Sequence, residues 1–196
     1  MATRSRSQHP GAREHAQSSF KRDARRRLGA HFPRRTLRRD PFNSLQKEDH
    51  TLHANDTTLI LKHYSPAHTD SDISVHFVEA DIFHTGDTFW NGYYPFIDYS
   101  TGGSIDGMIR ATEVNLGKVT DKMIVIPGHG AVGDKSQLAF YRDLLVDTRE
   151  KVATLKKQGK SLDEIVTAKP TAATDAKWGS GFRSAKDFIG DVFQGV

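Results

Sequence analysis

The chain changes character near residue 40, and this change limits which part of it can form a hydrophobic core. Residues 1–40 carry 12 Lys and Arg against 3 acidic residues, a net charge of +9, and their apolar residues follow no strand or helix period. Residues 41–196 carry a net charge of −5. A segment so basic and so poor in apolar residues cannot bury enough surface to offset its loss of conformational entropy. We therefore predict a disordered basic segment over residues 1–44 and one folded domain over residues 45–196.

Three interpretations of the basic segment stay open. A nucleic-acid arm would contact phosphates through its arginines. A transit peptide would also be rich in Arg and Ser and poor in acidic residues. An extension that arose from a translation-frame or gene-start artefact would have no function. The clustered arginines are Arg25, Arg26, Arg27, Arg34, Arg35, Arg38 and Arg39.

The sequence contains no signal for export or membrane insertion. It lacks the apolar stretch of a secretory signal peptide. No run approaches the ~20 apolar residues that a membrane-spanning helix requires. From the sequence as written we expect a cytoplasmic protein without membrane contact.

The folded part alternates strand and helix patterns, which predicts an α/β (α+β) domain. Runs rich in β-branched and aromatic residues, bounded by turn residues, predict strands over 57–64, 72–78, 81–85 and 122–126. Apolar residues at helical spacing, with Ser104 and Ser161 as N-caps, predict helices over 105–118, 135–158, 161–168 and 185–193.

Three turns each follow a predicted strand and each carry a side chain that can bind a metal. The turns contain His68, Asp87 and His129, and glycines flank the second and third. Ligand-binding residues gather at the carboxyl ends of strands in layered α/β folds, so the three side chains are expected to meet at one sheet edge. Imidazole and carboxylate ligands suit zinc, manganese or iron. The chain has no Cys, so a thiolate site or nucleophile is excluded.

Each turn taken alone also has an ordinary structural interpretation. Asp70 and Asp72 can accept backbone N–H bonds in a turn. His129 between two glycines can be an exposed loop residue. The order of the three turns and their shared position at strand ends favour the metal site.

Four sequence motifs occur in an order that resembles the C-terminal half of the metallo-β-lactamase fold hydrolases. The motifs are AHTDSD, HTGDTFWNGYYPFID, GGSIDGMI and IPGHG, within residues 45–196. The resemblance implies half of an αβ/βα sandwich in which two sheets hold a two-metal zinc site at one edge. It also implies that His68 is a ligand of the first metal, Asp87 an acidic ligand of the second, and His129 the last histidine ligand.

The first motif of that family, His-x-His-x-Asp-His, occurs nowhere in the sequence. The pair His50 and His53 has the wrong spacing to replace it. The resemblance therefore implies a truncated metal-dependent hydrolase with few ligands, doubtful zinc occupancy and impaired activity. The alternative is a non-catalytic fragment whose basic arm binds nucleic acid or another polyanion.

An aromatic loop after Asp87 is the candidate substrate-binding region. Trp90, Asn91 and Tyr93 are expected to line the mouth for a small-molecule substrate, although core or lid packing accounts for these residues equally well. Without the other half of the sandwich, the inner face of the sheet would lie uncovered and favour self-association.

Overall fold

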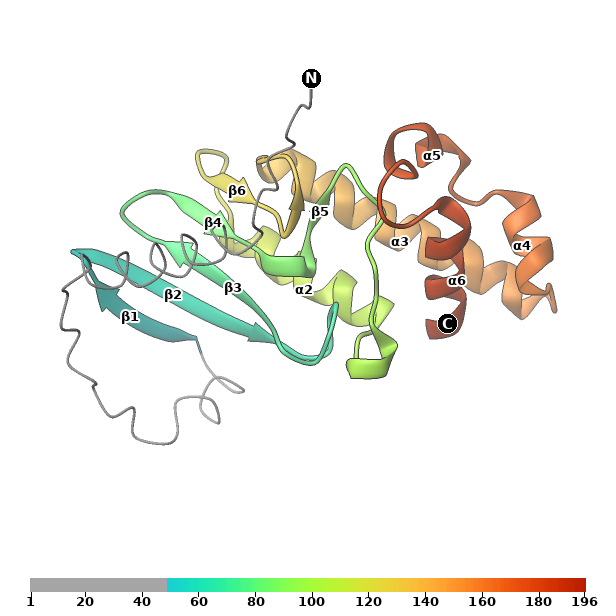
Figure 1. Ribbon diagram of the computed structural model, residues 1–196, viewed down its shortest axis with the longest axis horizontal. Helices are drawn as coiled ribbons and strands as arrows, with labels where there is room; N and C mark the ends of the chain where they lie inside the picture. The colour runs from blue at the N-terminus through green and yellow to red at the C-terminus, as the bar shows by residue number, and fades with distance from the viewer. Residues whose placement is uncertain (1–48) are drawn as a thin grey trace, which may run out of the picture. The chain divides into compact units, whose positions relative to one another are not determined.

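The computed structural model describes residues 49–196, so the predicted disorder of the basic segment lies outside the described residues. A five-stranded sheet has the order β1-β2-β3-β4-β6 (Figure 1). The first four strands are antiparallel neighbours, and β4 pairs in parallel with β6. The strands are β1 His50–Ala54, β2 Thr57–Tyr64, β3 Asp72–Phe77, β4 Ile82–His84 and β6 Ile124–Ile126.

The β1–β2 hairpin turns through Asn55 and Asp56, which both have positive φ, at 52° and 57°. Two successive residues of this kind form the tight turn that suits the twist of a hairpin, and Asn and Asp tolerate it well. The sequence analysis used this pair only as the boundary of β2. It therefore missed β1, whose short, largely polar sequence gives a weak strand signal.

Five helices and two short helical turns complete the described domain. They are η1 Gly86–Thr88, η2 Tyr99–Thr101, α2 Ile105–Lys118, α3 Lys135–Lys157, α4 Leu162–Ala168, α5 Ala172–Trp178 and α6 Ala185–Gly195. The side chain of Ser104 caps α2, and Ser161 with Glu164 forms the capping box of α4. The sequence analysis predicted α2, α3, α4 and α6, whereas α5 was missed. Strands β5 Trp90–Asn91 and β7 His129–Gly130 form a separate two-stranded sheet that was also missed.

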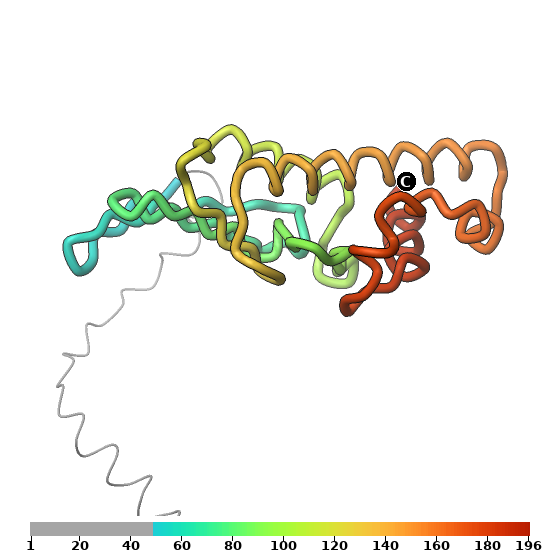
Figure 2. The backbone as a smooth tube through the Cα atoms, turned by 90° about the horizontal axis from the view of Figure 1, so that it is seen from above, coloured from blue at the N-terminus to red at the C-terminus, as the bar shows by residue number. Residues whose placement is uncertain are grey.

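One face of the main sheet packs against α2 and α3, which lie on the same side of the strands (Figure 2). The helices α4, α5 and α6 gather around the far part of α3, beyond the end of the sheet (Figure 1). The shared core is built from fully buried side chains of the strands, the helices and the loop after η1. Its largest members are Phe83, Phe89, Tyr94, Ile97, Ile105, Met108, Leu138, Tyr141, Leu145, Ile165, Phe188 and Ile189.

The other face of the main sheet is mostly apolar. Strand pairing and the alternation of side chains along each strand determine which residues lie on this face. Phe83 and Val125 are buried on the reverse face of the sheet. Its apolar members are Leu52, Leu59, Leu61, Ile73, Val75, Phe77, Ile82, Ile124 and Ile126, and the same register places His50, His63 and His84 among them. Leu52 is 51% exposed and Ile124 47% exposed. Within residues 49–196 no helix covers this face, which we call the open sheet face.

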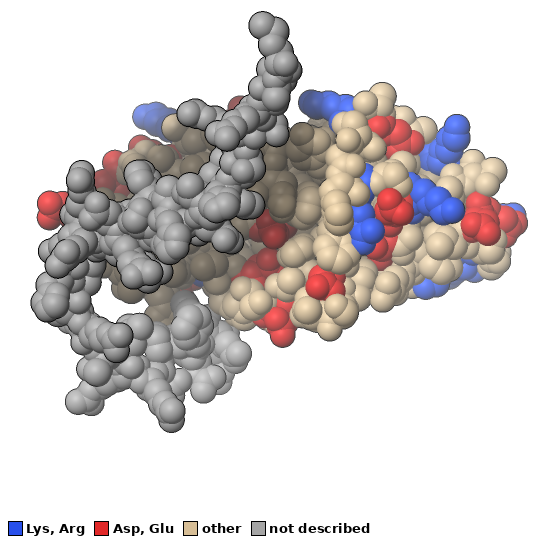
Figure 3. All heavy atoms as spheres, in the orientation of Figure 1, with Lys and Arg blue, Asp and Glu red and all other residues tan. Residues whose placement is uncertain are grey.

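Acidic and basic side chains are interspersed over the helical end of the domain in the view of Figure 3. In the part of the chain that the structure describes, no helix combines the length and the apolar character needed to cross a membrane.

Candidate metal centre

The structure brings His68, Asp87 and His129 together at the edge where β2, β4 and β6 end. Nδ1 of His68 lies 3.7 Å from Oδ2 of Asp87, and Nε2 of His129 lies 3.3 Å from Oδ1 of the same carboxylate. The side chain of His68 is 14% exposed, that of Asp87 34% and that of His129 50%. The carboxylate of Asp87 is therefore shared by two imidazoles at a site that solvent reaches.

Asp87 is held in place by a buried polar network under η1. Oγ1 of Thr88 donates to the carbonyl of Thr85 over 2.7 Å and accepts from the amide of Asn115 in α2 over 2.8 Å. The carboxylate also lies against the backbone of Gly128, where an added Cβ would be 2.1 Å from its Oδ1. A side chain at position 128 would occupy the space that Asp87 uses. Close packing against this carboxylate therefore explains why position 128 is a glycine.

His68 is positioned by its own loop and by Asp72. The carbonyl of His68 accepts the backbone N–H of Asp98 over 2.9 Å. Its Nδ1 lies 3.6 Å from Oδ1 of Asp72, a carboxylate that also accepts the N–H of Thr69 over 2.7 Å. The contact with Asp72 raises the pKa of His68 despite partial burial. Burial acts against ionisation of Asp72, but His68 and Thr69 outweigh it and lower the pKa of Asp72.

Trp90 orients the candidate ligands His129 and Asp87. Its ring stacks on His129 with 3.9 Å between centroids, and its indole N–H donates to the carbonyl of Asp87 over 3.0 Å. The backbone of His129 pairs with that of Trp90 through β5 and β7. Asn91 donates from its amide to the carbonyl of Ala131 over 2.8 Å, so it ties the His129 loop to the same sheet.

The predicted substrate contacts of Trp90, Asn91 and Tyr93 stay predictions. Trp90 is 5% exposed, so its visible role is to position His129 and Asp87. Tyr93 is 37% exposed and packs against Gly181, where an added Cβ would lie 2.4 Å from the ring.

The candidate ligands fit a metal ion in pairs but do not form a complete site. A tetrahedral ion with ligand bonds of about 2.0–2.1 Å keeps its donor atoms roughly 3.3 Å apart. The His129–Asp87 distance matches this spacing, and the His68–Asp87 distance is slightly longer. The two contacts use different oxygens of Asp87, however. Within residues 49–196 no group of three or more His, Cys, Asp or Glu side chains is placed to hold one ion.

Comparisons with known proteins identify the fold. No protein-family model and no curated protein matches the chain. The structure of a stereoselective inverting sec-alkylsulfatase, Pisa1 from Pseudomonas sp., matches 76% of the chain with a TM-score of 0.59 and 17% identity. A double mutant of this sulfatase matches the same share with a TM-score of 0.62 and 18% identity. The domain has the fold of the C-terminal half of a metallo-β-lactamase.

This half of a metallo-β-lactamase fold is the one that the sequence motifs predicted, and the prediction is confirmed. A metallo-β-lactamase from Pontibacter korlensis also matches 52% of the chain, with a TM-score of 0.44 and 18% identity. At 17% and 18% identity the two sulfatase structures show a shared fold and not a shared substrate. The chain spans about a quarter of the length of the sulfatase structures that it matches.

The sequence analysis missed three residues that lie around the candidate metal centre. Asp72 was interpreted as a turn residue, although its spacing of four from His68 was visible. Phe96 lies in the aromatic loop that follows Asp87, and its ring lies 5.8 Å from that of His68, a contact that the sequence does not indicate. Arg183 stacks on Phe96 with 4.3 Å from Cζ to the ring centroid. No sequence signal links Arg183 to residues that lie so far away along the chain.

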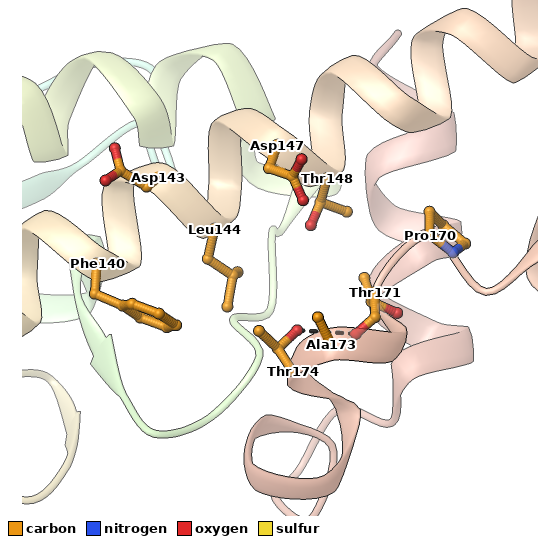
Figure 4. Close-up of a pocket in the computed structure, with 9 residues that line it drawn as sticks. All are labelled: Phe140, Asp143, Leu144, Asp147, Thr148, Pro170, Thr171, Ala173 and Thr174. Carbon is orange, nitrogen blue, oxygen red and sulfur yellow. Dashed lines mark hydrogen bonds between the residues drawn. The ribbon is translucent and has the colours of Figure 1, made fainter.

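A cavity lies in another part of the domain (Figure 4). It has a volume of about 200 Å³ and lies between α3 and α5. Phe140 and Leu144 supply its apolar wall, Asp143 and Asp147 lie at its α3 side, and none of the candidate ligands lines it. Its lining contains no histidine, and the cavity is separate from the candidate metal centre.

Proposed function

We propose that the domain carries one half of a zinc-dependent hydrolase site, with His68, Asp87 and His129 as ligands. The observation that supports this most directly is the sharing of one carboxylate by two imidazoles at 3.3 Å and 3.7 Å. The substrate is a small molecule with an electrophilic centre. The sulfatase that shares the fold makes sulfate esters one class to test.

The residues of this chain have distinct parts in the proposed reaction. Zinc would lower the pKa of a bound water and stabilise the oxyanion that develops when this water attacks. His129 and Asp87 would bind the zinc ion. Trp90 fixes the orientation of His129 by stacking and that of Asp87 through its indole N–H. Asp72 would help to orient the ring of His68, since its Oδ1 lies 3.6 Å from the same Nδ1 that faces Asp87.

The remaining ligands would come from another segment or another chain. The sequence lacks the His-x-His-x-Asp-His motif that supplies them in proteins of this fold. With three of its own ligands, the chain would bind zinc weakly, because each missing ligand leaves a water in its place. We therefore propose that activity of the chain by itself is impaired.

Zinc binding tests the ligand assignment directly. His129→Ala is expected to weaken zinc binding at least about tenfold, because even loss of a residue behind a ligand costs 10–100-fold in other metal sites. The measurement is isothermal titration with zinc chloride, with zinc per chain counted by elemental analysis.

A histidine outside the centre provides the matched control. His53 lies in β1 at the hairpin turn, and His53→Ala should leave zinc affinity unchanged. Equal losses in the two variants, or no loss in His129→Ala, would mean that zinc binds elsewhere.

We also propose that the open sheet face is an association surface. The exposed apolar residues of this face favour burial against a partner. The candidate half-site lies at one end of the same sheet. A second copy of the chain or a separate αβ layer would cover it.

Charges placed on the open sheet face should reduce association. Leu52→Glu combined with Ile73→Glu is expected to shift the chain towards monomer in light scattering coupled to gel filtration. Val114→Glu on α2, where the side chain is 39% exposed, introduces one such charge on the helical side and should change nothing. An identical mass distribution for the wild type and the double variant would contradict the proposal.

The alternative of polyanion binding depends on residues 1–44, outside the described part. The described residues themselves carry a net charge of −5 and offer no support for it. Steeply salt-dependent binding to DNA by the full chain, lost when the basic segment is removed, would establish that function.

A further inference from the structure

Phe182 is the most exposed large apolar side chain of the described domain, at 75%. It lies in the loop between α5 and α6. Covering an exposed aromatic ring with an apolar ligand removes apolar surface from water, which is favourable. An exposed ring that is held in place is therefore a candidate contact for an apolar ligand.

The loop that carries Phe182 is tied down on both sides. Gly181 packs on the ring of Tyr93, and the carbonyl of Trp178 accepts the backbone N–H of Tyr94 over 3.1 Å. The Arg183 side chain lies 5.6 Å from the Phe182 ring. Phe182 is therefore presented by a loop whose neighbours are held in place.

A continuous line of rings leads from Phe182 to the candidate ligands. Phe96 contacts Phe182 edge-on with 6.3 Å between centroids. The same Phe96 lies 5.8 Å from the ring of His68, also edge-on. The exposed ring is thus one aromatic side chain away from the candidate metal centre.

The positive charge in this cluster is already paired. Nε of Arg183 lies 3.2 Å from Oδ2 of Asp191, and both side chains are largely buried. Burial raises the pKa of Asp191 to about 6, so this carboxylate is mainly ionised at neutral pH and balances the arginine. The cluster therefore offers apolar contact and no free cation for an anionic group.

We propose that Phe182, Phe96 and Tyr93 form the subsite that binds the alkyl or aryl part of the substrate. This inference rests on the proposed hydrolase function, since it places the reacting group at His68 and the apolar part along the line of rings. Phe182 is then a specificity-determining residue, and the preferred substrates are amphiphilic, with an apolar group next to the bond that is cleaved.

A chain-length series tests the subsite without zinc. Butanoate, hexanoate and octanoate are titrated into the metal-free full chain and followed by backbone NMR shifts. Affinity should rise about threefold to fourfold for each added methylene. The largest shifts should fall on Gly181, Phe182 and Arg183. Phe182→Ala should flatten the chain-length dependence, and Phe182→Leu, which keeps apolar area, should retain most of it.

Phe140→Ala is the matched control, because Phe140 is another exposed aromatic residue and lines the separate cavity of Figure 4. It should leave the chain-length dependence unchanged. Equal dependence in the wild type and Phe182→Ala, or a loss in Phe140→Ala alone, would overturn the inference. A chain that binds no zinc but keeps the Phe182-dependent series would contradict the proposed hydrolase and still support the apolar subsite.

Discussion

Fusing a homologous half that carries His-x-His-x-Asp-His to residues 45–196 should raise turnover by on the order of a thousandfold or more. The added half would supply the ligands that this sequence lacks and cover the open sheet face. Two metals held at a fixed spacing can then activate water and stabilise the oxyanion together. The measurement is hydrolysis of a panel of an alkyl sulfate, a nitrophenyl ester and a lactam, alongside zinc content.

The same fusion with Asp87→Asn separates site assembly from the mere covering of the sheet. The amide keeps the shape of the side chain but loses the charge that two imidazoles share. This variant should fold as well as the parent fusion and show little turnover. Robust hydrolysis with tight binding of two zinc ions by the unfused chain would show that ligands outside our assignment complete the site.

Gly107→Ala should lower the free energy of unfolding by about 3 kcal/mol or more, because the new methyl group has nowhere to go. A Cβ at Gly107 would lie 2.1 Å from the carbonyl O of Pro66 and 2.6 Å from its carbonyl carbon. Both neighbours are backbone, so a rotamer change cannot relieve the overlap. For a domain of this size the melting temperature should fall by roughly 6–12 °C, measured by circular dichroism.

Gly117→Ala in the same helix is the matched control. No atom lies within 4 Å of a Cβ built at this position. Alanine favours a helix over glycine, so the variant should be about 0.5–1 kcal/mol more stable than the wild type. Opposite signs for the two substitutions are the expected result, and a similar loss in both would mean that α2 does not pack on Pro66 as described.

Gly107→Ala has a second consequence at the candidate metal centre. Pro66 begins the loop that carries His68, and the carbonyl of Ala67 accepts the backbone N–H of Ser104 at the start of α2. Displacing this loop should therefore weaken zinc binding, whereas Gly117→Ala should not. The pair links the packing of α2 to the position of a candidate ligand.

Local patterns in the sequence determined most of the elements that carry the centre. The strand over Thr57–Tyr64 and the helix over Ile105–Lys118 were predicted with the bounds that the structure has. Each depends on nearest-neighbour chemistry, namely β-branched runs for strands and a capping serine with helical spacing for α2. The three candidate ligands could be named for the same reason, since each was predicted in a turn directly after a strand, although Asp87 lies in η1 and His129 in β7.

Tertiary structure alone decided which distant residues support those ligands. Trp90 stacks on His129, Asp72 lies beside His68, and Arg183 reaches Phe96 from a loop near the C-terminus. These contacts depend on packing between elements separated by up to about half the chain, and no periodicity or spacing encodes them. Strands β5 and β7 show the same limit, because two-residue strands acquire their identity only from the partner with which they pair.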